Sequence, residues 1–127
     1  MDRRKFIKNI GTAGAAAFVL PRFSIASTKS PNSKLNVAFV GVGGVGGMAI
    51  NGMKSENAVA FCDVDTRMSG WHKKENPKSR FFQDYREMLD KMGKDIDAVC
   101  VSTPDHSHFK ITLDAMQCGK HVCVQKP

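Results

Sequence analysis

Short apolar runs alternate along the chain with longer segments that mix apolar and polar residues. Each run has three to six residues, the length of a strand in a buried sheet. The runs lie at 35–40, 59–62, 80–82, 98–101 and 121–124. Helices are expected between them at 45–53, 65–74, 84–92 and 105–118. This alternation predicts an α/β fold, a parallel sheet with helices on both faces.

Acidic and hydroxyl residues mark where several of these helices begin. Asp84 and Glu87 have the spacing of a capping box. Asp105 is the expected cap of the segment 105–118, and Asp65 or Thr66 that of the segment 65–74.

Two helices carry an apolar stripe that predicts which side is buried. The stripe of the segment 84–92 follows the spacing i, i+3, i+4, i+7 and consists of Tyr85, Met88, Leu89 and Met92. The stripe of the segment 105–118 consists of Phe109, Leu113 and Met116. We expect both stripes to pack in the core.

The first apolar run passes without a gap into G-V-G-G-V-G at 41–46. In this G-x-G-x-x-G turn between a strand and a helix, Gly41 allows a sharp turn, and Gly43 lets a pyrophosphate approach the backbone. Gly46 lets the helix pack closely on the sheet, while Gly44 and Val45 open a helix whose free N–H groups favour a phosphate. The pattern predicts a dinucleotide-binding, Rossmann-type, doubly wound sheet; the alternative is a glycine-rich turn in an ordinary α/β domain.

Asp63 stands at the end of the second apolar run, 17 residues after Gly46. A carboxylate there can accept hydrogen bonds from ribose hydroxyls and would repel a 2′-phosphate. This favours NAD over NADP, with NADP as the remaining alternative. Asp63 could instead cap the strand end or start a turn.

The basic character of the chain is concentrated at its N-terminus. The net charge is +7, and residues 1–26 hold five basic residues against one acidic residue. The remaining lysines and arginines are scattered, with one Trp and one Tyr, so we expect no nucleic-acid partner. The length of 127 residues suits one domain.

The four cysteines do not form a metal-binding pattern. They contain no C-x-x-C pair, and no His stands at zinc-ligand spacing from two of them, so no metal site is predicted. Three of them, Cys62, Cys100 and Cys123, fall in predicted strands, where we expect small buried core residues. The fourth is Cys118.

Residues 1–26 have the pattern of an export signal. A basic segment with twin arginines, D-R-R-K-F-I-K at 2–8, precedes a short apolar segment and the small residues at 24–26 that signal peptidase requires. The segment resembles the twin-arginine (Tat) signal, S/T-R-R-x-F-L-K, with Asp2 and Ile7 as departures. A general secretory leader and an uncleaved anchor are the alternatives.

The Tat pathway exports folded proteins, which suits a protein that must bind a nucleotide in the cytoplasm. The resemblance therefore implies the Tat translocase and signal peptidase as partners, and a periplasmic or extracellular location. We expect a linker at 27–34 and the dinucleotide-binding domain at 35–127.

Near the C-terminus, T-P-D-H-S-H at 103–108 is followed by Ala115, by G-K-H-V at 119–122 and by Lys126-Pro127. This order is similar to the Gfo/Idh/MocA oxidoreductase family, whose members carry T-P-[ND]-x-x-H, A-L-x-x-G-K-H-V and E-K-P after the glycine turn. The resemblance covers roughly residues 35–127 and implies an NAD(P)-dependent enzyme, most often a dehydrogenase of sugars or polyols.

The resemblance also implies roles for single residues. Gly41, Gly43 and Gly46 would hold the pyrophosphate and Asp63 the adenosine ribose. Thr103 and Pro104 would line the nicotinamide side, with His108 nearby. Lys126 would contact the nicotinamide and the substrate hydroxyl as the candidate catalytic residue. Without the resemblance, His106 and His108 would be interpreted as surface residues at a helix end, and Lys126 as a solvated lysine.

The chain departs from the family pattern at two points. Gln125 replaces the Glu of E-K-P and cannot supply a negative charge beside Lys126. The chain also stops at Pro127, where the family continues into a second α/β domain with the substrate site. We therefore expect a cofactor domain that is inactive alone, and a homo-oligomer in the full-length form.

Three functions are compatible with these features. The first is an exported oxidoreductase that transfers a hydride between the nicotinamide and a carbon bearing a hydroxyl group. The second is an NAD-dependent glycoside hydrolase, since some members of the family oxidise a sugar transiently, eliminate the aglycone and reduce the sugar again. The third is a non-catalytic nucleotide-binding protein.

Overall fold

Five parallel strands form one sheet in the spatial order β3-β2-β1-β4-β5. The computed structural model describes residues 32–126, in which the folded unit begins at Lys34; the predicted leader lies outside the described residues. The strands are β1 (Asn36–Val40), β2 (Asn57–Cys62), β3 (Arg80–Phe82), β4 (Ala98–Val101) and β5 (His121–Val124). The five predicted strands and the Rossmann-type α/β fold are confirmed.

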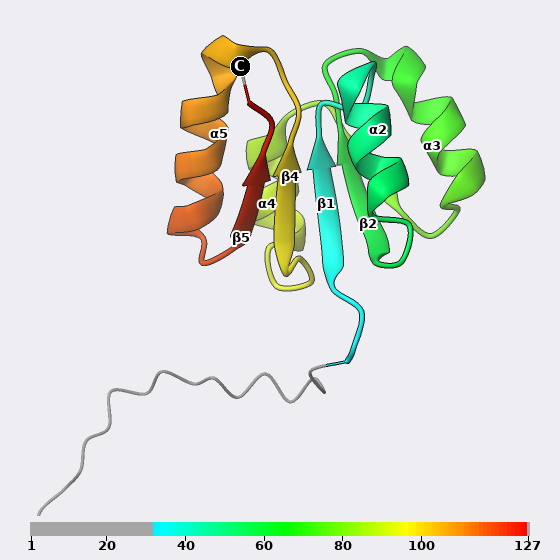
Figure 1. The fold of residues 1–127 in the computed structure, drawn as a ribbon, viewed down its shortest axis with the longest axis horizontal. Coiled ribbons are helices and arrows are strands. Elements are labelled where there is room, and N and C mark those ends of the chain that lie inside the picture. The colour runs from blue at the N-terminus through cyan, green and yellow to red at the C-terminus, as the bar shows by residue number, and fades with distance from the viewer. Residues whose placement is uncertain (1–31, 127) are drawn as a thin grey trace, which may run out of the picture. The chain divides into compact units, whose positions relative to one another are not determined.

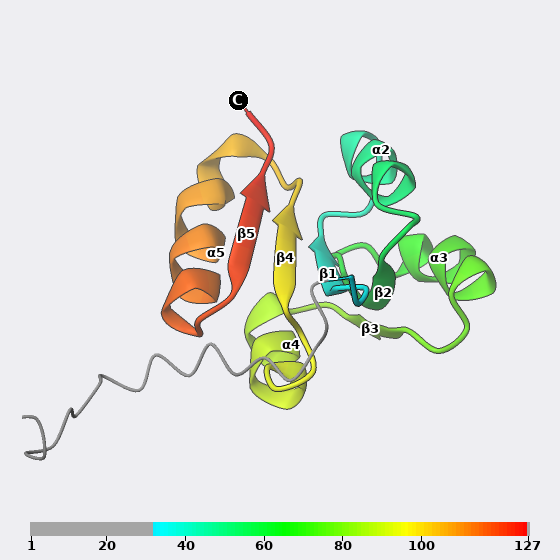
Figure 2. The same cartoon turned by 60° about the horizontal axis from the view of Figure 1, so that its bottom comes forward.

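Helices cover both faces of the sheet. They are α2 (Val45–Gly52), α3 (Ser69–Glu75), α4 (Tyr85–Met92) and α5 (Asp105–Gln117), with a 3₁₀ turn, η1 (Thr66–Met68), before α3. The first two lie on one face and the last two on the other (Figures 1 and 2). The chain winds outward from β1 to β3 and then from β4 to β5, so its direction reverses between β1 and β4. Open α/β sheets bind ligands at such a point.

The central strands feed two separate cores because successive side chains of a strand point to opposite faces. Ala38 and Val40 of β1 pack in the core that contains Met88 of α4. Phe39, between them, packs in the other core with Ile50 of α2. The sheet is therefore buried on both sides, which explains why its central strands are nearly continuous apolar runs.

The buried residues of α4 agree with the apolar stripe predicted for the segment 84–92. Met88, Leu89 and Met92 are buried, and Tyr85 packs against the same core. The carboxylate of Asp84 accepts a hydrogen bond from the N–H of Arg86 at 2.8 Å, so Asp84 is the cap. This N–H belongs to the second helical residue and not to the third, as a capping box requires, and Glu87 pairs with Lys91, 2.5 Å away; the predicted capping box therefore does not form.

The stripe predicted for α5 is wrong. Phe109, Leu113 and Met116 are 76%, 37% and 60% exposed, whereas Ile111 and Ala115 are buried. Both sets recur at helical spacing, so periodicity alone could not decide between them. The set with the smaller residues faces the sheet, where Ala115 allows the helix to approach closely.

Two predicted helix starts also differ from the structure. Asp105 is the first residue of α5 and not its cap, because Pro104 occupies the N-cap position. The segment 65–74 begins with the turn η1, and the carboxylate of Asp65 accepts a hydrogen bond from the N–H of Arg67 at 3.0 Å. Asp65 therefore caps a 3₁₀ turn, and the α-helix starts only at Ser69.

The cysteine prediction holds for two of the three strand positions. Cys62 and Cys100 are buried, but Cys123 is exposed, as is Cys118. Cys123 lies on β5, which is the outermost strand on its side among the described residues. No helix within 32–126 is long and apolar enough to cross a bilayer.

Candidate dinucleotide-binding site

The glycine turn after β1 passes close to the backbone that follows β4. The N–H of Gly41 donates to the carbonyl of Cys62 at 2.8 Å, and Gly41 has a φ of +81°. A Cβ on Gly41 would lie 2.7 Å from the carbonyl carbon of Ser102, and a Cβ on Gly46 would lie 2.1 Å from the carbonyl oxygen of Gly41. Only glycine fits at either position, so the steric roles predicted for both residues agree with the structure.

The next part of the turn is open. A Cβ on Gly43 would meet only the sulfur of Met68, at 3.5 Å, and a Cβ on Gly44 would meet nothing within 4 Å. Within residues 32–126, neither N–H donates to a protein acceptor, and no side chain caps α2. Free N–H groups at the positive end of a helix dipole are suited to an anion. The pyrophosphate-binding roles of Gly43, Gly44 and Val45 stay predictions that this geometry fits.

Asp63 links the glycine turn to the end of β2. Its Oδ2 accepts a hydrogen bond from the N–H of Val42, and its Oδ1 accepts one from the N–H of Asp65, both at 3.0 Å. Asp63 therefore starts a turn, as the alternative interpretation held. Each carboxylate oxygen has two acceptor sites, so both oxygens can still accept a ribose hydroxyl.

His72 lies beneath the same turn and was missed by the sequence analysis. Its side chain is 2% exposed, and its Nε2 lies 3.2 Å from the carbonyl oxygen of Val42. The ring stacks on Phe61 and meets Trp71 edge-on, with centroid separations of 4.9 and 4.5 Å. Burial lowers the pKa of His72 below its ordinary value, against the opposing effects of the Val42 bond, Glu75 and Asp63. A single histidine within a helix has no spacing that would reveal this contact.

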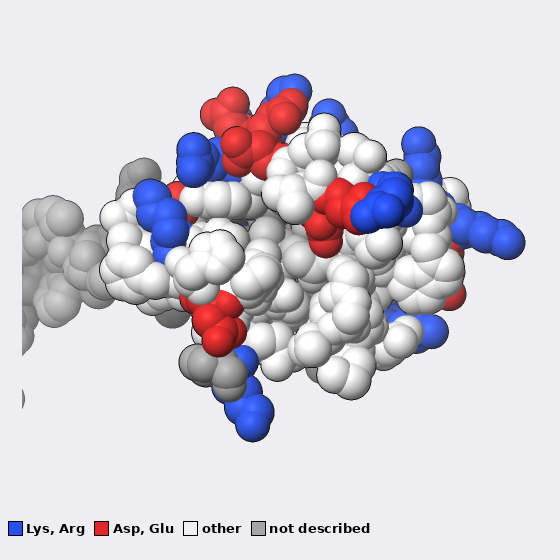
Figure 3. Space-filling model, turned by 90° about the horizontal axis from the view of Figure 1, so that it is seen from above, with Lys and Arg blue, Asp and Glu red and all other residues white. Residues whose placement is uncertain are grey.

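A crevice of about 600 Å³ opens where the strands end. It brings together five predicted residues, Gly41, Gly43, Asp63, Thr103 and Pro104. It is also lined by residues that the sequence analysis did not assign to a site, among them Gln83, Arg86 and Ser107. Figure 3 looks onto the edge of the sheet at which the strands end, and most of the middle of this face consists of uncharged residues.

The turn after β4 is braced by its own helix. The hydroxyl of Ser107 donates to Thr103 Oγ1 at 2.7 Å, and Nε2 of His108 donates to the carbonyl of Thr103 at 2.5 Å. His108 thus supports the crevice wall through Thr103. Lys126 is exposed, and the N–H of Gln125 beside it bonds to the carbonyl of Val101 at 2.9 Å.

Cys62 lies in the floor of the crevice. Burial, with smaller contributions from Asp84, Asp63 and Glu87, raises the pKa of its thiol to about 12. The thiol is therefore protonated at neutral pH and is no nucleophile. Within the described part of the chain, no three His, Cys, Asp or Glu side chains form a group that could hold a metal ion.

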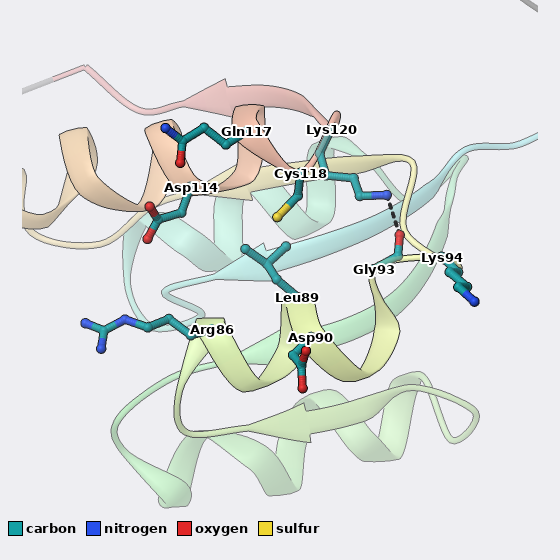
Figure 4. A pocket seen from close by; sticks show the side chains of 9 residues that line it. All are labelled: Arg86, Leu89, Asp90, Gly93, Lys94, Asp114, Gln117, Cys118 and Lys120. Atoms are coloured by element: carbon teal, nitrogen blue, oxygen red, sulfur yellow. Dashed lines mark hydrogen bonds between the residues drawn. The ribbon is translucent and has the colours of Figure 1, made fainter. Parts of the chain in front are cut away.

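A second hollow, of about 640 Å³, lies between α4 and α5. Figure 4 shows Leu89 in its floor and Lys120 bonded to the carbonyl of Gly93. Asp114 at its edge is already paired with Lys110 and with the hydroxyl of Tyr85, and both bonds lower the pKa of Asp114. This hollow contains no predicted site residue.

The comparison with protein families agrees with a dinucleotide-binding domain. The family model for GFO_IDH_MocA, an oxidoreductase family with an NAD-binding Rossmann fold, matches residues 35–127. The chain belongs to the Gfo/Idh/MocA oxidoreductase family. It carries the NAD-binding domain of that family, and the open N–H groups at the start of α2 fit the cofactor.

Two glycosidases are among the curated proteins that are similar to this Gfo/Idh/MocA chain. A glycosyl hydrolase family 109 protein of Solibacter usitatus is 30% identical over 145 residues, which are 99% of this chain and 33% of the relative. An alpha-N-acetylgalactosaminidase of Shewanella oneidensis is 29% identical over 156 residues, 100% of this chain and 34% of the relative. The chain thus spans about a third of the length of these curated relatives.

A solved structure represents the dehydrogenases. The scyllo-inositol dehydrogenase of Lactobacillus casei with bound NAD(H) and scyllo-inositol is 27% identical, with a TM-score of 0.67 over 75% of this chain and 28% of that chain. The family therefore includes both polyol dehydrogenases and glycosidases among the proteins similar to this one.

Two adjacent glycines of α2 provide a test of the close approach. We expect Gly46→Ala to destabilise the fold by about 3 kcal/mol or more, because the new Cβ would overlap the carbonyl of Gly41. Gly47→Ala is the matched control, since its Cβ would meet nothing within 4 Å. That change should stabilise the helix by about 0.5–1 kcal/mol. Urea denaturation measures both, and equal effects would contradict the steric role of Gly46.

Proposed function

We propose that this domain binds NAD in the crevice, and that the enzyme to which it belongs transfers a hydride between NAD and a CH–OH group of a sugar or polyol. The observation that carries the proposal is the open glycine turn at the reversal point of the sheet, in a chain that the family model matches over 35–127. The inositol dehydrogenase structure supports the substrate class.

The residues on this chain would bind and orient the reactants. The N–H groups of Gly43, Gly44 and Val45 would hold the pyrophosphate, and Asp63 would accept hydrogen bonds from the adenosine ribose. Thr103 and Pro104 would form the nicotinamide side of the crevice. NAD would supply the nicotinamide ring that exchanges the hydride with the substrate.

Lys126 would position the substrate hydroxyl at the end of β5. Because Gln125 is neutral, no adjacent carboxylate from this motif would hold the lysine as an ammonium ion. Lys126 would then act chiefly by hydrogen bonding, and the groups that transfer the proton would come from a second domain of the enzyme.

A second candidate function is NAD-dependent glycoside hydrolysis. It is favoured by the extent of the curated matches, because the two glycosidase relatives align with 99–100% of the chain. In this reaction the hydride removed from the sugar would be returned to it after the aglycone has left, so NAD would be regenerated.

We also propose that the protein is exported through the Tat pathway to the periplasm or beyond. The support is the twin arginine at 3–4 followed by a short apolar segment. Export of a folded domain would allow NAD to be bound before translocation.

Charge at Asp63 should control the choice of cofactor. We expect Asp63→Asn to weaken NAD binding about fivefold, because a neutral acceptor replaces a charged one. The ratio of the affinity for NAD to that for NADP should decrease. Calorimetry with both nucleotides measures this, with Asp65→Asn as control, since Asp65 pairs with Arg67. Failure of the unaltered protein to bind either nucleotide would refute the proposed function.

Turnover separates the two candidate reactions. The longest form of the protein that its gene encodes would be incubated with NAD and either an inositol or an aryl α-N-acetylgalactosaminide. A dehydrogenase accumulates NADH with the polyol, whereas a hydrolase releases the aryl alcohol without net NADH. Release of the aryl alcohol that continues after bound NAD has been removed from the protein and none is added would contradict both candidate reactions.

The twin arginine should decide the export route. Replacing Arg3 and Arg4 by lysines keeps the positive charge and removes the Tat motif. We expect a reporter fused after the leader to stay in the cytoplasm, while a general secretory leader would still export it. Cell fractionation gives the answer, and unchanged export would refute the Tat proposal.

A further inference from the structure

The contact between His72 and the glycine turn has a defined direction. Nε2 of His72 lies 3.2 Å from the carbonyl oxygen of Val42, the residue between the first two glycines. A carbonyl oxygen only accepts hydrogen bonds, so Nε2 must carry the proton that it donates. The stacking on Phe61 and the edge contact with Trp71 hold the ring, and therefore the donor, in one orientation.

This bond also orients the next N–H along the chain. The carbonyl of Val42 and the N–H of Gly43 belong to one planar peptide unit, and no peptide bond within 32–126 is cis. In a trans unit the two groups point in opposite directions. Because the carbonyl points inward to His72, the N–H of Gly43 points outward, and Gly43 lines the crevice.

A second side chain fixes the other flank of Val42. The N–H of Val42 donates to Asp63 Oδ2 at 3.0 Å. The peptide units on both sides of this buried residue are thus held by side chains from α3 and from the end of β2. Without the His72 bond, Gly43, which lacks a Cβ, would let the Val42–Gly43 unit rotate easily. A rotated unit would present its carbonyl oxygen to the crevice, where it would repel a phosphate.

Simple core packing does not explain a histidine at this position. Its Nδ1 is buried and has no hydrogen-bond partner among the described residues, which is a cost that phenylalanine would avoid. A phenyl ring could make the same stack on Phe61. The polar ring is accounted for by the bond to Val42, which is the only hydrogen bond that the ring makes within 32–126.

We propose that His72 is a positioning residue for the dinucleotide: it holds the carbonyl of Val42 inward and thereby aims the N–H of Gly43 at the pyrophosphate. This inference rests on the proposed binding of NAD by the crevice. His72 itself does not touch the ligand; it acts through the Val42–Gly43 peptide unit.

Four substitutions in the full chain test the proposal. His72→Phe keeps the ring and removes the donor, whereas His72→Gln retains an amide N–H near the position of Nε2. His72→Asn carries its amide nearer the position of Nδ1 and is too short to reach Val42. Trp71→Phe is the control, because a phenyl ring at this position keeps an edge contact with His72 and leaves its bond to Val42 in place. Calorimetry gives the affinities for NAD and for ADP, which shares its pyrophosphate.

We expect His72→Phe and His72→Asn to weaken NAD and ADP about tenfold, the effect of one lost hydrogen bond to a charged group. The affinities of His72→Gln should stay within about threefold of those of the unaltered protein. The affinities of Trp71→Phe should equal those of the unaltered protein. The amide resonance of Gly43, followed by ¹⁵N NMR, should shift on ligand binding in the unaltered protein and in His72→Gln, and less in His72→Phe.

The outcomes separate the positioning role from the function itself. If the unaltered protein binds NAD and His72→Phe binds it equally well, the positioning role is overturned and the proposed function stands. If His72→Phe does not fold, the Gln and Asn variants decide, and equal affinities overturn the proposal. If the unaltered protein binds neither nucleotide, the proposed function and this inference fail together.

Discussion

The site depends on one close approach between two glycines. The first turn of α2 lies so near the end of β1 that a Cβ on Gly46 would come within 2.1 Å of the carbonyl of Gly41. This approach places the start of α2 directly over the carboxyl edge of the sheet. The helix therefore starts beside the crevice between β1 and β4, where the winding of the sheet reverses, and Gly43, just before the helix, lines that crevice.

Part of the site could be predicted from the sequence because its causes are local. Gly41 and Gly46 are five residues apart, and the steric reason for each is a missing Cβ next to nearby backbone. Asp63 follows from the rule that parallel strands end at the same edge. Its bonds to Val42 and Asp65 show that the ribose ligand and the turn-starting residue, which the sequence presented as alternatives, are compatible roles.

The parts that could not be predicted depend on distant contacts. His72 meets Val42 across 30 residues, and nothing in the spacing around a single helical histidine indicates its partner. For α5, two apolar sets share the helical period, and only the distance between helix and sheet selects Ile111 and Ala115 over the bulkier Phe109 and Met116. Cys123 is exposed because of its strand's place in the sheet, which its apolar run does not reveal.

The differing exposure of the cysteines has a practical consequence. Cys62, in the crevice floor, and Cys100 have thiol pKa values raised to about 12 and about 11, chiefly by burial, whereas Cys118 and Cys123 lie at the surface. Alkylating reagents require an accessible thiolate, so maleimide dyes should attach at the two surface positions and leave the crevice unmodified. The protein thus carries natural labelling sites that allow fluorescence measurements with the candidate crevice intact.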